Sequence, residues 1–219
     1  MTDDHPIERS FSEVTALARA AVRGVGDAWG IAEDAATAVH WLHRQGLDGC
    51  AALAGLLLVR DGQAAGDWAP RPEGPVWTAA GGVLCPLATG AALADRGAAV
   101  MVAPPNLGPL AAPLLLLPFV ADVARGRGPL TARWDGVTAV TDGAGLAIDG
   151  AMSALMVGQA SAVTLRPGGR LARAEGLCDR AFVAPAAWQR LNLFADRTLA
   201  PATPESRALG AGGGDDSAG

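Results

Sequence analysis

The sequence predicts an α+β fold, or a mixed α/β fold, and three observations lead to this prediction. Apolar residues recur at helical spacing through the first sixty residues, a long apolar block follows at residues 74–121, and short β-rich runs with Asp-Gly turns come after it. Together they predict an N-terminal helical part, apolar central strands and a helix, and a C-terminal antiparallel meander with a final helix. A chain of 219 residues can bury one full hydrophobic core.

Ser10 begins the first predicted helix, because Glu13 stands three residues later and completes a capping box. The glycine-rich GVGDAWG that follows has the wrong spacing for a dinucleotide-binding loop, and it follows a helix instead of a strand. The buried stripe of this helix is expected to consist of Val14, Leu17, Ala18, Ala21, Val22 and Val25.

A second helix is predicted over residues 31–45 and ends before Gly46. His40 and His43 lie three residues apart on it and, with Glu33, offer metal-ligand chemistry. Helical geometry places His40 and Glu33 opposite the apolar stripe, so we expect a solvated histidine face and predict no metal. The apolar stripe consists of Ile31, Ala35, Ala38, Val39 and Leu42.

A third helix begins near Asp48 and ends at Gly62, and because it is apolar nearly all round we expect other elements to surround it. Residues 60–75 are rich in Gly, Pro and Asp, which favours a boundary there or a long surface loop. The predicted parts are an N-terminal helical part at 1–72, an α/β core at 73–200 and a Gly/Asp-rich tail at 201–219.

The apolar block at residues 74–121 contains only two charged residues, Asp95 and Arg96, where the chain-wide charged fraction of 18% predicts about nine. Five prolines in residues 97–121 exclude a membrane-spanning helix, because they would leave backbone carbonyls unpaired in hydrocarbon. The short apolar runs at 98–103 and 114–117 predict strands that are buried on both faces.

The strongest turn signal is Asp135-Gly136, which stands between β-branched runs and predicts a hairpin pairing Arg133 and Trp134 with residues 137–139. Pro185 begins the last predicted helix. The face of that helix is expected to carry Trp188, Leu191, Ala195 and Leu199.

Lysine and tyrosine are absent from the chain, and all 17 basic residues are arginine. The missing lysine excludes Schiff-base, P-loop and pyridoxal-phosphate chemistry, and the missing tyrosine excludes reductases that use a Tyr-Lys pair. Net charge is −5 with dispersed arginines, so no nucleic-acid partner is expected. Arginine and alanine usage also suggests a GC-rich genome.

The start of the chain is polar and acidic, without an apolar segment of signal-peptide length. The three cysteines, Cys50, Cys85 and Cys178, are odd in number and widely spaced, which is typical of free thiols in a reducing compartment. We therefore expect a cytoplasmic protein without a membrane partner.

Cys85 is a weak candidate for a catalytic residue, because it stands just before Pro86 at the predicted start of a helix, where a thiol pKa is lowered. A buried, inert cysteine is the alternative. All three histidines lie within residues 5–43, so the sequence assigns no base to this thiol.

The candidate ligand-binding residues are Asp95, Arg96, Arg125 and Arg127. We expect the Asp95–Arg96 pair to be buried at one wall of a pocket, because a buried guanidinium needs acceptors beyond one carboxylate. Arg125 or Arg127 would add a second positive group. The alternative is that these residues end a helix and cover the surface.

Residues 10–49, GGVLCPLATGAALAD at 81–95 and the tail at 201–216 resemble a family of alanine-rich bacterial proteins of uncharacterised function. The resemblance implies that residues 206–216 are more than a fraying end. Residues 12–58 are weakly similar to the malate and sulfolactate dehydrogenases that lack a Rossmann fold. Those enzymes continue with Ser-His-Gly, where this chain has Cys50-Ala51-Ala52.

Two functional hypotheses follow. The first is a non-catalytic binding or accessory protein, in one version a homo-oligomer. It binds a small anionic metabolite that carries a carboxylate or a phosphate group. The alternative is an enzyme, either a cofactor-dependent oxidoreductase or a transferase or hydrolase that depends on Cys85. The sequence identifies no cofactor and does not decide between the two.

Overall fold

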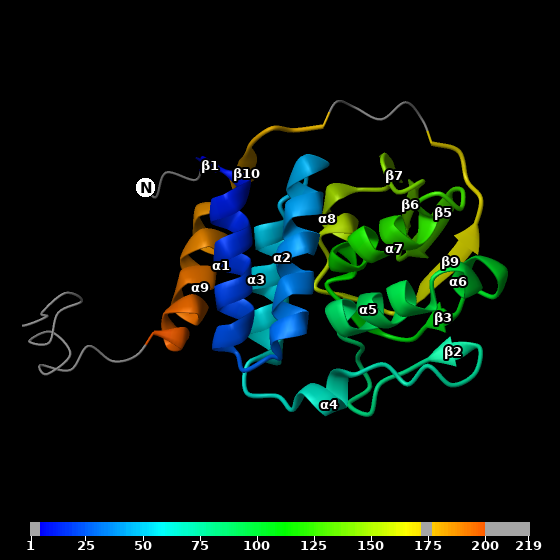
Figure 1. The fold of residues 1–219 in the computed structure, drawn as a ribbon, viewed down its shortest axis with the longest axis horizontal. Coiled ribbons are helices and arrows are strands. Elements are labelled where there is room, and N and C mark those ends of the chain that lie inside the picture. Colours follow the sequence, from blue (N-terminus) through cyan, green and yellow to red (C-terminus); the bar gives the residue numbers. More distant parts are fainter. Residues whose placement is uncertain (1–4, 172–176, 200–219) are drawn as a thin grey trace, which may run out of the picture.

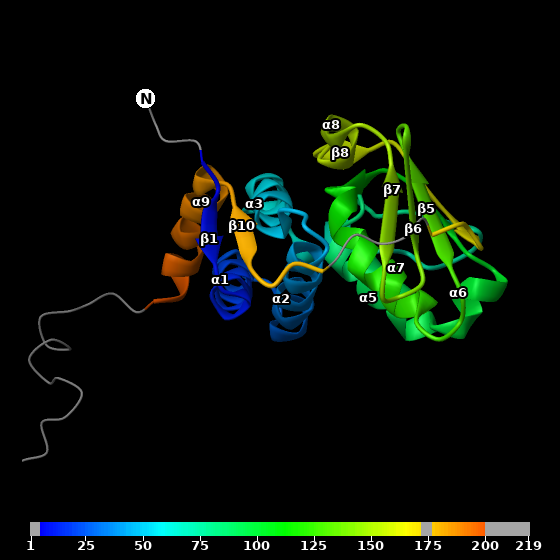
Figure 2. The ribbon, with the colours of Figure 1, turned by 90° about the horizontal axis from the view of Figure 1, so that it is seen from above.

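The computed structural model describes residues 5–171 and 177–199 and has an α+β architecture in which helices pack side by side with a sheet (Figure 1). One group of helices lies at one side of the molecule, and a second group covers one face of the main sheet beside it (Figure 2). The first group consists of α1 (Phe11–Gly24), α2 (Trp29–Arg44), α3 (Gly49–Arg60) and α9 (Pro185–Ala195). The second consists of α5 (Pro86–Arg96), the 3₁₀ helix η1 (Pro113–Leu116) and α7 (Leu117–Ala124).

The main sheet has six strands in the order β2-β3-β9-β5-β6-β7, and only the β2–β3 pair is parallel. Its strands are β2 (Val76–Trp77), β3 (Asn106–Leu107), β5 (Leu130–Trp134), β6 (Val137–Thr141), β7 (Leu146–Asp149) and β9 (Val163–Pro167). Two small sheets pair β1 (Ile7–Arg9) with β10 (Ala181–Val183) and β4 (Leu110–Ala111) with β8 (Gln159–Ala160). The remaining helices are α4 (Ala65–Trp68), α6 (Ala98–Val102), α8 (Met152–Leu155) and η2 (Asp196–Thr198).

The predicted start of α1 is confirmed. The backbone N–H of Glu13 donates to Ser10 Oγ at 3.2 Å, and the Ser10 N–H donates to Glu13 Oε2 at 2.8 Å, so both halves of the capping box are present. The predicted stripe faces the core, with Val14, Leu17, Ala18, Ala21 and Val22 all buried.

Helix α2 lies near its predicted bounds, but its histidine face is only partly solvated. His40 is half-buried against the Phe11 ring, and His43 is buried with 2% exposure. His43 turns inward because it lies in the last turn of α2, where α3 begins and covers it.

Helix α3 begins after Asp48, as predicted, and Asp48 caps it by accepting the Ala51 N–H at 2.9 Å. Helix α3 packs against α1, α2, α9 and η1, as its nearly all-round apolar surface predicts. The exception is near its C-terminal end, where Leu58 and Val59 are 50% and 54% exposed.

Helix α9 packs against α1 and α3, although the chain reaches it only after the sheet. Asp48 Oδ2 accepts the Ala184 N–H at 2.8 Å, which ties the start of α9 to the start of α3. Leu199 lies beyond the end of α9 and is exposed, so its predicted place on one face of this helix is wrong. The predicted tail at 201–219 lies outside the described residues.

The two predicted central strands are wrong. Residues 98–103 form α6, and residues 114–117 form η1 and the start of α7. Short apolar runs do not distinguish a buried strand from a buried helix. Pro113 and Pro118 stand in the first turns of η1 and α7, where a missing backbone N–H has no cost.

The antiparallel meander is confirmed. Trp134 pairs with Val137 and Arg133 with Thr138, across a two-residue turn in which Asp135 and Gly136 have φ values of 34° and 85°. Both φ angles lie in the left-handed region that this kind of turn requires. Within the described residues, no helix is long and apolar enough to cross a lipid bilayer.

We expect Gly136→Val to lower the free energy of unfolding by at least about 1 kcal/mol, because a β-branched residue is strained at positive φ. The control is Gly55→Ala in the exposed part of α3, which should stabilise the protein because alanine favours helix. Neither site has other atoms within 4 Å of an added Cβ, so chemical denaturation of the two variants isolates the backbone effect. Equal changes in stability would contradict this explanation.

Candidate functional site

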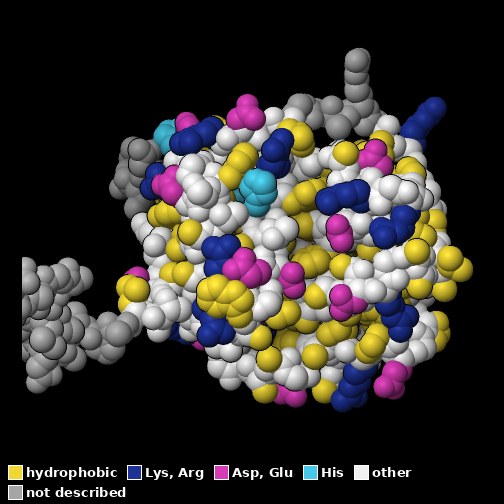
Figure 3. Space-filling view, viewed as in Figure 1, with side chains coloured by type: hydrophobic (Ala, Val, Ile, Leu, Met, Phe, Trp, Pro, Cys, Tyr) yellow, Lys and Arg dark blue, Asp and Glu magenta, His cyan; other side chains and the backbone are white. Residues whose placement is uncertain are grey.

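A groove with a cavity volume of about 350 Å³ lies where α2, α5 and α7 meet. Figure 3 shows apolar side chains inside a hollow between α2 and the α5–α7 pair, and acidic side chains along the edges of this hollow. The lining consists of Asp34, Thr37, Ala38 and Trp41 from α2, Ala91, Ala94 and Asp95 from α5, and Pro118, Phe119, Asp122 and Arg125 from α7 and its end. Each helix contributes residues at i, i+3 and i+4 spacing, so one helical face forms each wall.

The apolar walls of the groove are held by close packing. An added Cβ at Gly90 would lie only 2.2 Å from the Phe119 ring, so the absence of a side chain at this position lets the ring pack directly on α5. Phe119 is thereby fixed between α5 and α7, and it faces a cavity that also receives Trp41.

Four charged groups line the groove. Arg125 Nη1 lies 3.6 Å from Asp122 Oδ1, and both side chains are mostly exposed, so water screens this pair. Partial burial raises the pKa of Asp34, and the negative charges of Asp95 and Glu33 raise it further. Asp34 and Asp95 are therefore close enough to repel each other.

The structure brings together two of the four predicted ligand-binding residues, Asp95 and Arg125. The expectation that Asp95 and Arg96 are buried is wrong, because both are exposed at the last turn of α5. Arg96 donates to the Pro72 carbonyl at 2.8 Å, and its guanidinium lies 4.9 Å from the centre of the Trp77 ring. Arg127 donates to the Val123 carbonyl at 3.0 Å and so caps the end of α7.

Asp34, Trp41 and Phe119 also line the groove, and the sequence did not predict them as site residues. A signal was present, because Asp34, Thr37, Ala38 and Trp41 are spaced as one helical face beside the predicted stripe. Nothing in the sequence pattern indicated that α5 and α7 would lie opposite this face.

A second cluster is fully enclosed and joins three elements. Arg60 donates two hydrogen bonds to Asp27, from Nη1 and Nη2, both at 2.6 Å, and each side chain is only 5% exposed. Arg60 Nη1 also lies 3.8 Å from Cys85 Sγ. The cluster links the α1–α2 turn, the last turn of α3 and the start of α5.

Cys85 precedes the first turn of α5, as predicted, but its thiol is not placed to react. The residue is 1% exposed, and burial raises the pKa of the thiol more than the Leu87 and Ala88 amides and Arg60 lower it. A protonated thiol enclosed by protein is a poor nucleophile. The structure thus places Cys85 in the core.

His43, Asp48 and Cys50 form a third cluster, in which one candidate ligand atom from each residue lies within 4.8 Å of the others. Hydrogen bonds already occupy the imidazole and the carboxylate: the Cys50 backbone N–H donates to His43 Nε2 at 3.4 Å, and the two Asp48 oxygens accept the N–H groups of Ala51 and Ala184. Burial also raises the pKa of the Cys50 thiol. The cluster therefore acts as a structural junction between α2, α3 and α9.

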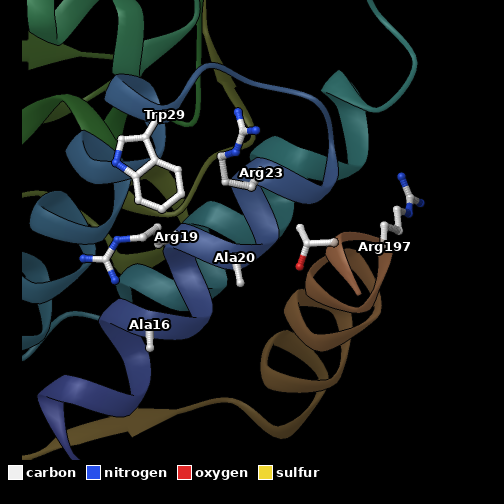
Figure 4. Close-up of a pocket in the computed structure, with 7 residues that line it drawn as sticks. Ala16, Arg19, Ala20, Arg23, Trp29 and Arg197 are labelled. Atoms are coloured by element: carbon white, nitrogen blue, oxygen red, sulfur yellow. The ribbon is translucent and has the colours of Figure 1, made fainter. Parts of the chain in front are cut away.

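A further pocket of about 400 Å³ lies between α1, the start of α2 and η2 (Figure 4). Figure 4 shows Arg19 and Trp29 at one side of the pocket and Arg197 at the other. Arg19 is paired with Glu33 at 2.5 and 2.9 Å, and Arg197 with Asp61 at 2.6 and 2.9 Å. Arg23, the third arginine of the lining, has no carboxylate partner among the described residues and donates to the Asp27 carbonyl. Because all three guanidinium groups already have an acceptor, this pocket offers less to an anion than its arginine content suggests.

The fold and the groove define an α+β protein with a pocket of small-molecule size between two groups of helices. Residues 9–85 match the model of a family described as a protein of unknown function (DUF3726). The match confirms for these residues the predicted likeness to uncharacterised proteins, and it includes the α2 wall of the groove. No curated protein and no solved structure matches the chain, and the similarity to the dehydrogenases stays a prediction.

We expect Asp27→Ala to destabilise the protein by about 3–5 kcal/mol, because it leaves the Arg60 guanidinium buried without its carboxylate. Asp61→Ala is the matched control: it also removes a carboxylate from a two-bond pair with arginine, but in an exposed position. Its effect should be far smaller, since water and salt already weaken that pair. Urea unfolding measures both, and similar losses would show that burial of the Asp27 pair is not decisive.

The three thiols should differ in reactivity toward an aromatic disulfide reagent. Cys178 is partly exposed, whereas Cys50 and Cys85 are buried with raised pKa values, so one thiol should react in the native protein and all three after unfolding in denaturant. Colour release counts the thiols, and Cys178→Ser should remove the fast reaction. Fast native labelling of Cys85 would restore it as a candidate nucleophile.

Proposed function

We propose that this protein binds a small metabolite without converting it, and that the groove between α2, α5 and α7 is the binding site. The observation that carries the proposal is the composition of the groove, whose walls are mostly apolar and aromatic while a few charged groups point into the same space. Ligand sites typically combine an apolar surface with a small number of polar groups, and they favour the boundary between structural units. A volume of about 350 Å³ suits a small metabolite.

The lining residues favour binding over catalysis. They include no cysteine, histidine or serine, and their titratable groups are three carboxylates. The lining therefore lacks the thiol and the imidazole that most often serve as nucleophile and base. The thiol-dependent alternative has little support, because Cys85 is enclosed away from the groove. For the small anion expected from the sequence, Arg125 is the one positive group among the lining residues.

We place this binding protein in the cytoplasm of a bacterium. The support is that Cys50, Cys85 and Cys178 are all unpaired, as is usual for proteins in a reducing compartment. The bacterial source rests on the sequence resemblance alone.

A thermal-shift screen of small carboxylates, phosphates and amines should find at least one metabolite that raises the melting temperature of the purified protein, because binding to the native state stabilises it. Filling the groove with Ala91→Phe should abolish that shift. The control is Ala186→Phe, which adds the same bulk on the exposed side of α9 and should leave the shift intact. Calorimetric titration then gives the affinity of each protein.

Two results would count against the proposal. Equal binding by the wild type and Ala91→Phe would place the ligand elsewhere on the protein. If mass spectrometry detected conversion of the bound metabolite to another compound, the protein would be an enzyme.

A further inference from the structure

The charges in the groove are unbalanced. The lining contains three carboxylates and one guanidinium, a formal charge of −2. Arg125 is close to Asp122, so these two side chains offset each other. Asp34 and Asp95 remain, and within the described part of the chain neither has a hydrogen bond or an ion pair.

An unpaired carboxylate beside an apolar wall is unfavourable. Asp34 is partly buried on α2, and Asp95 faces the same cavity from α5. The raised pKa of Asp34 has both expected causes, loss of water and repulsion by Asp95 and Glu33. A positive group between Asp34 and Asp95 would relieve this repulsion, whereas an anion would increase it.

The positive group is organic rather than a metal ion. Asp34, Asp95 and Asp122 do not form a group close enough to share an ion, and among the described residues the one such group lies at His43, Asp48 and Cys50. The rest of the lining is alanine, proline and aromatic carbon, apart from Thr37. Such walls suit an apolar body, which a metal ion lacks.

We propose that the ligand of the groove is an organic ammonium ion with an apolar body, a conclusion that rests on the proposed binding function. The ammonium group lies between Asp34 and Asp95, and the apolar body lies against Trp41 and Phe119. Aromatic faces also attract ammonium groups directly. A carboxylate on the same ligand would meet Arg125, so an amino-acid-like zwitterion belongs to this class.

The packing of Phe119 supports a preformed site. Its ring is fixed on α5 at Gly90 before any ligand enters, so binding does not have to order this side chain. Charge and shape are thus provided by different elements, with carboxylates on α2 and α5 and the fixed aromatic ring on α7.

Three probes of similar shape test the ligand class: phenethylammonium, phenethyl alcohol and phenylacetate, which are cationic, neutral and anionic. Each is titrated into the wild-type protein by calorimetry at matched ionic strength. We expect phenethylammonium to bind at least about tenfold more tightly than the alcohol, the factor that one charge-assisted hydrogen bond supplies. Phenylacetate should bind most weakly, because Asp34 and Asp95 repel it.

Asp34→Asn tests the residue assignment. It should weaken phenethylammonium binding about tenfold and leave the affinity for phenethyl alcohol unchanged. Its melting temperature without ligand should not fall, because the substitution removes a repelled charge, so lost binding is not a folding defect. The control is Glu73→Gln, which removes one negative charge at an exposed position away from the lining and should bind as the wild type does.

Four outcomes overturn the inference. Equal affinities for phenethylammonium and phenethyl alcohol, with both lost in Ala91→Phe, would reject the ammonium ligand but keep the groove as a binding site. Tighter binding of phenylacetate would show that Arg125 selects an anion. Equal effects of Asp34→Asn and Glu73→Gln on phenethylammonium binding would show that the net charge of the protein attracts the ligand, without a direct contact at Asp34. No binding of any probe, together with no shift in the metabolite screen, would reject the proposed function as well.

Discussion

The buried pair between Asp27 and Arg60 lies where the two groups of helices meet. Asp27 stands in the turn that leads into α2, and Arg60 stands at the end of α3, in contact with Cys85 at the start of α5. Two charged groups with so little exposure must stay in contact, because each has lost its hydration and is stabilised mainly by the other. Through Asp27 and Cys85, Arg60 contacts the segments that lead into α2 and α5, and these two helices form opposing walls of the groove.

The groove also depends on side chains that are small. Ala38, Ala91 and Ala94 leave the space between the helices open, and Gly90 lets an aromatic ring pack flat where a larger residue would separate α5 from α7. The apolar character that buries these helices thus also produces the walls of the cavity. The charged residues stand at its edges, where water remains available to them when no ligand is present.

Local signals in the sequence predicted local structure well. The capping box at Ser10, the turn at Asp135 and the start of α5 after Cys85 each depend on a few neighbouring residues, and the structure contains all three. The apolar run at residues 98–103 has no periodicity that separates a strand from a helix, and Val100 is the one residue of α6 that is buried. The groove was only partly predictable, since its walls come from three separate segments whose meeting is decided by tertiary packing. Asp95 was found because it interrupts an apolar block, whereas Asp34 stands beside Glu33 on an amphipathic helix, where a carboxylate gives no such contrast.

The close packing of α1 on α9 has a consequence for synthesis. An added Cβ at Gly24 would lie 1.8 Å from the Phe194 carbonyl oxygen, so the first helix is shaped to receive the last one. The ribosome makes α1 long before α9, and strand β1 likewise waits for β10. The face of α1 that packs against α9 therefore stays uncovered in the nascent chain until residues 185–195 have been made, and chaperones that hold such faces can bind there during that interval.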